Sequence, residues 1–573
     1  MVDVPFPKIS APGERPQSAG GRLINCYPET LPSTAGKPYA YWRVPGLSVF
    51  GTAPSGAYRG GVQVAGTFYG LFGTTVYKWA STGGAGTALP GSITGSQFCA
   101  FAANQNVPPD IAVVSPGVGA FIVVDPTGVA AYPGVVVGTP DWVVYHLGFF
   151  IFSYGSGTTR ASDVNSTNIN SINFATAQSK PDTLYRALPL GNGQLLLAGS
   201  TTIEVWGGSN PTGYPFSYIS TIFRGIVNQN AIAGNEDGWG KGIFFVGDDY
   251  KVSTLTTYTP TPVSTPEIDL LIENEPDKSK IIVGVYVSRG HGMVVVQAPT
   301  WCWEYDTTLL SWHERQSYLQ TFWRGYQPIN VFGVWLCGDS LGSNLLQISG
   351  TVRTEGGQNE VQSLATTGTP TGGTFTLSFG GQTTSAIVFN ATAAQVQTAL
   401  AALSNIGSVI CTGGPLPSAV TMTLAKSPLA LITLGANSLT GGTAPSVTIT
   451  RTTAGIVVSP LRMRIETGPA GAFPRTLRIN QISLYMTKGA SDATGHDPDE
   501  TNAMVEIAMS RDGGQSWSNT RQVPIGRQSV TNLRARASIW GQAEIQGVRW
   551  RFDESAGLKF AFMGADMAVD QLR

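Results

Sequence analysis

The sequence has little charge: Asp, Glu, Lys and Arg together make up 12% of its 573 residues, about half the usual share for a soluble domain. The 35 basic and 36 acidic residues leave a formal net charge of −1 at pH 7. Such a chain has no general electrostatic attraction to nucleic acid or to an anionic membrane. Low charge also suits a protein whose surface is largely covered by neighbouring subunits.

Cysteine and histidine are scarce as well. The five cysteines are odd in number, widely spaced and without a CxxC pair, which argues against a disulfide framework and a structural zinc site. We expect buried thiols in a protein assembled in a reducing cytoplasm. None of the four histidines stands at metal-ligand spacing, and neither HExxH nor GxSxG occurs. The sequence therefore predicts no metal, no cofactor and no enzymatic activity.

Long apolar runs are absent too. No run approaches the roughly 18–20 residues needed to span a bilayer. The N-terminal residues MVDVPFPKIS lack the basic start and apolar core of a secretory signal. We therefore expect neither a membrane span nor a cleaved leader.

Glycine and proline, by contrast, are plentiful, with 70 and 36 residues. Frequent turns between short alternating strands are typical of an all-β protein. Residues 1–54 read as an extended, proline-rich lead-in, because closely spaced prolines exclude a helix and a central strand. Residues 55–350 repeat a unit of two or three strands about every 30 to 50 residues, the spacing of β-propeller blades. About six or seven units can be counted, and a two-sheet sandwich remains an alternative.

The composition changes after Gly350. Residues 361–452 are rich in Thr, Ser, Gly and Ala and have one predicted helix, 393–404, with a capping box formed by Thr392 and Gln395 and with Gly407 beyond its end. We interpret this segment as a small α+β module inserted into the chain. Residues 456–573 alternate again, and their many arginines are nearly balanced by acids. They predict a C-terminal β-sandwich with a polar, interacting surface.

One sharp motif occurs in the last segment, the sequence SRDGGQSW at 510–517. It matches the S-x-D-x-G-x-[ST]-W pattern of an Asp-box, in which the carboxylate accepts N–H bonds inside a hairpin turn and the Trp packs beneath. The predicted turn residues are Ser510, Asp512, Gly514, Ser516 and Trp517.

A glycosidase would need further groups, such as a carboxylate pair or a Tyr nucleophile with arginines. Arg549, Arg551, Tyr485 and Glu544 are the available residues, but nothing in their spacing requires such a site. The acids within Trp301–Asp306 also suggest sugar binding, although a blade strand ending in an Asp turn explains them as well. The structural interpretation is the stronger one for both stretches.

Seven short stretches follow one another in a recognisable order along the chain: Arg43–Leu47, Leu197–Trp206, Arg224–Val227, Ala231–Gly234, Phe244–Gly247, Ile268–Ile272 and Trp303–Asp306. Together they resemble the tail-hub or nozzle proteins of short-tailed bacteriophages, the packaged-DNA stabilisation family. The resemblance covers roughly residues 20 to 345, together with a β-rich C-terminal domain. The 361–452 module departs from the family pattern and resembles Thr/Gly-rich modules of phage structural proteins.

The resemblance implies a structural virion protein of the tail, assembled in the host cytoplasm into a ring, commonly a hexamer. The implied partners are the portal-adaptor ring, a tail fibre, spike or plug protein, and double-stranded DNA touched transiently and without sequence preference in the channel. The alternative function is a phage receptor-binding or glycan-degrading tail protein. A cellular propeller scaffold has no positive support.

Overall fold

The computed structural model describes residues 2–13, 20–134, 137–177, 179–208, 213–357, 359–406, 409–424, 430–455, 458–471, 475–491, 501–543, 545 and 547–571. The chain forms two compact units. The propeller unit comprises Lys8–Ile24 and Val49–Gly350, and the sandwich unit comprises Met1–Pro7, Asn25–Ser48 and Thr351–Arg573.

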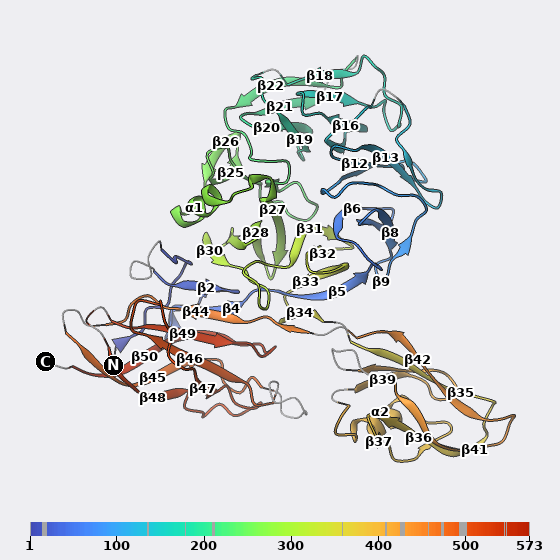
Figure 1. Ribbon diagram of the computed structural model, residues 1–573, viewed down its shortest axis with the longest axis vertical. Coiled ribbons are helices and arrows are strands. Elements are labelled where there is room, and N and C mark those ends of the chain that lie inside the picture. The colour runs from blue at the N-terminus through green and yellow to red at the C-terminus, as the bar shows by residue number, and fades with distance from the viewer. Residues whose placement is uncertain are drawn as a thin grey trace. The chain divides into compact units, whose positions relative to one another are not determined.

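The described part of the propeller unit contains seven groups of four neighbouring strands, which we number as blades 1 to 7 (Figure 1). Blades 1 to 5 are separate four-stranded antiparallel sheets, and blades 6 and 7 are parts of larger sheets. Blade 1 contains β6 (Tyr58–Val64), β7 (Thr67–Phe72), β8 (Thr75–Trp79) and β10 (Thr87–Ala88). Blade 2 contains β11 (Ala100–Ala103), β12 (Ile111–Ser115), β13 (Gly119–Val124) and β14 (Gly128–Ala131). Blade 3 contains β15 (Trp142–His146), β16 (Phe149–Ser153), β17 (Thr158–Ala161) and β18 (Phe174–Thr176). Blade 4 contains β19 (Leu184–Pro189), β20 (Gln194–Gly199), β21 (Ile203–Gly208) and β22 (Phe216–Ile222). Blade 5 contains β23 (Ile232–Ala233), β24 (Ile243–Val246), β25 (Val252–Thr256) and β26 (Thr259–Pro262).

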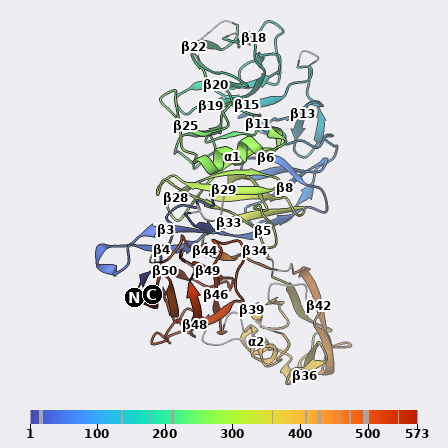
Figure 2. The ribbon, with the colours of Figure 1, turned by 60° about the vertical axis from the view of Figure 1, so that its left-hand side comes forward.

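Blades 6 and 7 follow the unit's one α-helix among the described residues. This helix, α1 (Pro266–Asn274), connects blade 5 to blade 6, and Figure 2 shows it at the front of the propeller unit. Blade 6 contains β27 (Ile282–Ser288), β28 (His291–Ala298), β29 (Trp301–Asp306) and β30 (Ser311–Glu314). Blade 7 contains β31 (Gly325–Val331), β32 (Val334–Asp339), β33 (Asn344–Ser349) and the later part of β5 (Gly46–Thr52). The short elements beside them are β2 (Arg22–Ile24), parallel to β30, β9 (Gly84–Ala85), parallel to β5, and the 3-10 helix η3 (Lys278–Lys280).

The first strands of neighbouring blades contact each other from β6 through β11 and β15 to β19, and from β23 through β27 to β31, with β31 back against β6. Between β19 and β23, Arg186 Nη1 donates to Ile232 O at 3.3 Å. Blades 4 and 5 share an apolar core that includes Leu196, Ile232 and Phe245. Blades 1 and 2 share another, with Leu71 and Val113. The seven blades therefore form a closed ring, which confirms the propeller predicted from the repeats.

The ring is closed by a strand from the other end of the sequence. Residues of β5 lie beside β33, and Ala53 N donates to Ser343 O at 3.0 Å. The fourth strand of blade 7 thus comes from the predicted lead-in, because the chain after β33 leaves the propeller. The edge of β33 is thereby covered, which removes an exposed strand edge.

The sandwich unit contains two facing sheets, which confirms the predicted C-terminal β-sandwich. Trp550 lies edge-on to Trp540, with ring centroids 4.9 Å apart, and Phe552 lies 6.0 Å from Phe562 across the interior. The first sheet contains β3 (Cys26–Thr30), β4 (Tyr39–Arg43), β50 (Ala561–Gln571), β45 (Leu477–Met486), β48 (Arg536–Ala543) and β1 (Val2–Asp3) beside β50. The second contains β44 (Met463–Glu466), β49 (Arg549–Glu554), β46 (Met504–Ser510) and β47 (Arg521–Pro524).

The lead-in contributes to this unit as well. Its strand β3 carries Pro28 at the edge of the first sheet, where a missing N–H costs no ladder bond. The 3-10 helix η2 (Ser33–Ala35) joins β3 to β4. The division of the chain into four parts, residues 1–54, 55–350, 361–452 and 456–573, remains a prediction.

The α+β module is present as predicted, with a core of its own that includes Phe375, Leu400 and Met422. Its entry and exit strands, β34 (Thr354–Gly357) and β43 (Ser459–Pro460), pair with each other. Its two sheets contain β39 (Val409–Gly413), β40 (Val420–Leu424), β35 (Val361–Thr367) and β42 (Ser446–Thr453); β37 (Gln382–Thr383), β36 (Gly372–Phe379), β38 (Ile387–Val388) and β41 (Thr433–Thr440).

The module's helix, α2, runs over Ala393–Ala401. The expected capping box is confirmed: Gln395 N donates to the Thr392 hydroxyl, and the Gln395 side chain accepts from Thr392 N. The helix ends three residues earlier than predicted, because Leu403 N bonds to Leu400 O in a tighter turn. Gly407 lies outside the described residues.

Candidate functional site

The Asp-box forms a turn between β46 and β47. Asp512 Oδ1 accepts from the Ser510 hydroxyl at 2.7 Å and from Ser516 N at 2.9 Å, and Oδ2 accepts from the Ser516 hydroxyl at 2.5 Å. Gly514 N donates to Ser510 Oγ at 2.7 Å. The carboxylate is therefore occupied by bonds within its own turn. These bonds lower the pKa of Asp512 below its ordinary value, with the Ser516 hydroxyl and amide as the main causes.

Trp517 is half-buried beside this turn. The guanidinium of Arg551 lies 4.9 Å from its ring centroid, so the indole packs against a cation and holds the turn to β49. All five predicted turn residues thus lie together in a structural arrangement.

The residues named for a glycosidase site are not brought together. Arg549 reaches Thr467 O at 3.3 Å, and Arg551 pairs with Asp553 at 3.2 Å. Tyr485 belongs to the other sheet, where Lys37 Nζ lies 4.5 Å from its ring centroid. Glu544 lies outside the described residues.

The two acids within Trp301–Asp306 lie in the interior of blade 6. Asp306 Oδ1 accepts from the amides of Thr308 and Leu309 at 2.8 and 3.2 Å and so closes a turn, as predicted. Its Oδ2 lies 2.7 Å from His291 Nδ1. Glu304 and Asp306 are both fully buried, so neither is accessible to a sugar.

Glu304 is the centre of a buried polar cluster that the sequence did not reveal. Its carboxylate accepts from Tyr286 OH at 2.9 Å, lies 2.9 Å from His313 Nε2 and lies 3.8 Å from Arg315 Nε. Burial alone would raise the pKa of Glu304, but Arg315 and His313 hold it below its ordinary value. All four side chains are completely buried, so the charge of Glu304 is compensated inside the propeller unit and not by solvent.

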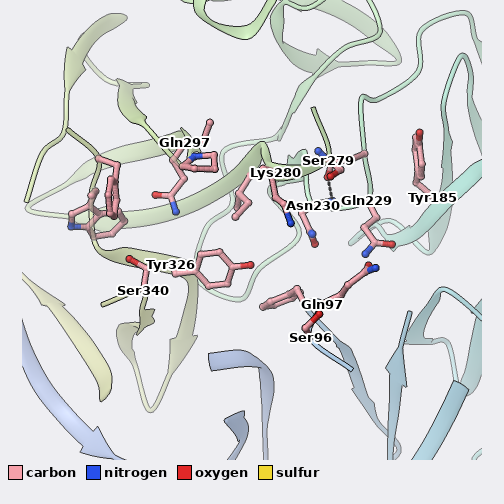
Figure 3. Close-up of a pocket in the computed structure, with 17 residues that line it drawn as sticks. Ser96, Gln97, Tyr185, Gln229, Asn230, Ser279, Lys280, Gln297, Tyr326 and Ser340 are labelled. Carbon is pink, nitrogen blue, oxygen red and sulfur yellow. Dashed lines mark hydrogen bonds between the residues drawn. The ribbon is translucent and has the colours of Figure 1, made fainter. Parts of the chain in front are cut away.

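A cavity of about 650 Å³ lies inside the propeller unit (Figure 3). Gln97 precedes β11 of blade 2, Gln229 and Asn230 precede β23 of blade 5, and Trp323 precedes β31 of blade 7. Blades 2 and 5 are not neighbours in the ring, so a cavity that both line lies at its centre. We call it the axial cavity. No sequence signal marks it, since its residues come from separate blades.

The cysteines and histidines of the described residues lie apart from any metal or disulfide site. All five cysteines are buried, and none forms a disulfide. His146 stacks on Phe216 with ring centroids 5.7 Å apart, while His496 lies outside the described residues. Within the described ranges, no cluster of three or more His, Cys, Asp or Glu is suited to a metal ion, and no helix is long and apolar enough to cross a membrane.

Comparison with known proteins gives one family and several distant structures. No curated protein matches the chain. PorZ, a surface component of the type-IX secretion system of Porphyromonas gingivalis, is 11% identical, with 52% of this chain and 37% of that chain covered and a TM-score of 0.33. The WD40 β-propeller domain of Doa1 is 12% identical, with 53% and 96% covered and a TM-score of 0.31.

The family model described as "Bacteriophage P22 Gp10, beta-propeller" matches residues 21–353. The matched stretch contains the whole closed ring of blades, including the closing strand β5. It spans more than half of the 573 residues. The chain therefore belongs to the bacteriophage P22 Gp10 family of packaged-DNA stabilisation proteins.

Proposed function

We propose that this phage structural protein forms a ring in a short tail, below the portal and its adaptor ring. The ring, a homohexamer, continues the DNA channel and helps to retain packaged DNA. Its outer surface offers contacts to a tail fibre, spike or plug. The protein acts without catalysis. The observation that carries the proposal is the family match over the complete propeller.

The balanced charge of the chain supports a channel through which DNA slides, rather than one that binds DNA tightly. The 35 basic and 36 acidic residues nearly cancel, and strong duplex binding requires many neutralised phosphates. DNA must slide through such a channel during ejection, so weak contact suits the role. The glycan-degrading alternative rests on the Asp-box, whose carboxylate is engaged in its own turn.

The decisive experiment uses phage particles that lack this protein. Packaged DNA is under pressure and the portal alone is an open hole, so such particles should fill with DNA and then lose it. DNA content would be measured by nuclease protection during and after packaging, with complemented particles as the control. Full retention without the protein would contradict the proposal. A virion reconstruction that shows a lone spike or a trimeric fibre would contradict the ring.

The purified ring should bind duplex DNA poorly at physiological salt. Binding would be followed by fluorescence anisotropy across a salt series. Tight binding with a steep salt dependence, the mark of many released counterions, would mean that the channel grips DNA and that the sliding conduit is wrong.

A further inference from the structure

We propose that a pocket in the sandwich unit binds a small phosphate monoester, either of a sugar or of a nucleoside. The pocket has a volume of about 620 Å³, which lies within the usual range for small-molecule sites. Its described lining includes no acidic side chain but four basic ones, and we call it the basic pocket. The four are Lys37, Lys488, Arg534 and Arg536. The proposal is independent of the tail role, because these residues belong to the sandwich unit alone.

Strand β45 and the start of β48, which are neighbours in the first sheet, supply most of the lining (Figure 1). Ser483 stands opposite Arg536 in their ladder, and Leu484 N donates to Ala535 O at 2.8 Å. Successive side chains of a strand point to opposite faces of the sheet. Ala535 is buried, whereas Arg534 and Arg536 on either side of it are exposed. The two guanidinium groups therefore lie on the outer face of the sheet, where the pocket opens.

Three of the four cations lack a counter-charge. The exception is Lys37, whose Nζ lies 3.0 Å from Asp3 Oδ1 and 3.7 Å from Asp566 Oδ1. Within the described residues, three lining side chains have neither an ion-pair partner nor a hydrogen-bond partner: Lys488, Arg534 and Arg536. The whole chain has a formal net charge of −1, so this excess of positive charge is a local feature. It is complementary to an anion that carries more than one charge.

The available donors favour a phosphate over a carboxylate. A phosphate monoester carries about −1.5 to −2 charge at pH 7 and three strong acceptor oxygens, whereas a carboxylate has one charge and two oxygens. The planar forks of two arginines match the oxygens of a phosphate. The Gln481 side chain donates to Ser483 Oγ at 2.9 Å, so the Ser483 hydroxyl remains available as a further donor toward a ligand.

The shape of the site favours a small ligand over nucleic acid. Duplex DNA is bound through many phosphates along a stripe of basic residues, whereas these cations line a single pocket. Tyr485 also lines the pocket and is 43% exposed. Its ring offers an apolar surface beside the cations, against which the sugar or the base of a phosphate monoester can pack.

The test is isothermal titration calorimetry on the full-length protein at fixed ionic strength. The probes are glucose 6-phosphate and adenosine 5′-monophosphate, and glucose and adenosine are the matched controls that lack the phosphate. At least one ester should bind in the micromolar to millimolar range, and its control should not. The ester that binds more tightly identifies the source of the phosphate. Added salt should weaken binding, because it screens exposed charges.

Two variants test the arginines of the basic pocket. Arg534→Gln and Arg536→Gln each remove one exposed charge and should each weaken binding about three- to tenfold. The double variant should lose measurable binding while its thermal unfolding midpoint stays that of the wild type. Arg478→Gln is the matched control, because Arg478 is exposed on β45 but does not belong to the described lining. It should leave the affinity unchanged.

Several results would overturn the proposal. One is the absence of binding of both esters, and another is equal affinity of the double variant and the wild type. Citrate that binds more tightly than either ester through the same arginines would show that the pocket takes carboxylates. Duplex DNA that binds the wild type tightly and the double variant weakly would make this face a contact for nucleic acid. Failure of the proposal would leave the DNA-retention experiment on phage particles unaffected.

Discussion

The exposed carboxylate of Asp512 accepts hydrogen bonds from two hydroxyls and an amide within its own turn. Asp512→Ala should destabilise the 510–518 turn by about 1 kcal/mol, because the side chain is exposed and each bond contributes modestly. Faster hydrogen exchange at the Ser516 amide would report the loss. Gln515→Ala, in the same turn and exposed, is the matched control. Glycan cleavage by the wild-type protein that disappears in Asp512→Ala would contradict the structural role.

The stability of the turn around Asp512 should depend on pH. The pKa of Asp512 lies below its ordinary value because the turn bonds favour the ionised form. Its contribution to stability is therefore complete above the unfolded pKa of about 3.9 and is lost as the pH falls through the lowered folded value. Exchange at Ser516, corrected for intrinsic rates, should rise over that acid range. Asp512→Asn should show no such rise, and an equal rise in both proteins would contradict the explanation.

We expect Glu304 to contribute more to the free energy of unfolding than Asp512, because Arg315 and His313 are buried with it. Glu304→Gln removes the charge that compensates Arg315 and should cost about 3 kcal/mol. Thermal unfolding should show a lower midpoint for the propeller. Glu273→Gln, exposed on α1, is the control and should have no effect. Since the pKa of Glu304 is lowered, its stabilisation is present above about pH 4.3 and is lost at lower pH. An unchanged midpoint in Glu304→Gln would contradict the cluster's stabilising role.

At the scale of elements, β5 closes the ring against two blades. A Cβ on Gly51 would lie 2.6 Å from Nε1 of the buried Trp79 in blade 1. Gly51→Ala should therefore push β5 from its place and destabilise the propeller by about 1–3 kcal/mol. Denaturant unfolding would measure the loss. Gly191→Ala is the control, because nothing lies within 4 Å of its Cβ position. Equal stability of both variants would show that β5 does not hold the ring closed.

At the scale of the whole molecule, the α+β module is inserted between two paired strands. Thr354 of β34 stands opposite Pro460 of β43, and the module's first and last strands, β35 and β42, pair with each other. The two ends of the insertion are thus adjacent. Replacing residues 361–452 by a short Gly-Ser linker should leave the rest of the chain folded and able to assemble. Size-exclusion chromatography with light scattering would test it, and an insoluble or misassembled product would show that the module is part of the body.

Sequence determined what depends on neighbours along the chain. The Asp-box turn at Asp512 and the capping box of Thr392 and Gln395 need bonds only across two to four residues, so their residue types are sufficient evidence. The helix α1 carries a local signal of the same kind, Thr265 followed by Pro266 at the first helical position. The all-β class follows for the same reason, because alternation and turn residues repeat locally.

Only the tertiary structure decided the number of blades, the closing strand and the axial cavity. The repeats indicated six or seven units, and the seventh blade is completed by β5, whose partner strand β33 lies about 300 residues away in the sequence. The partners of Glu304 and the wall around Trp323 and Asn230 are likewise assembled from strands that no local pattern relates. A propeller brings its inner strands together by closing the ring, and closure is a property of the folded chain rather than of any segment within it.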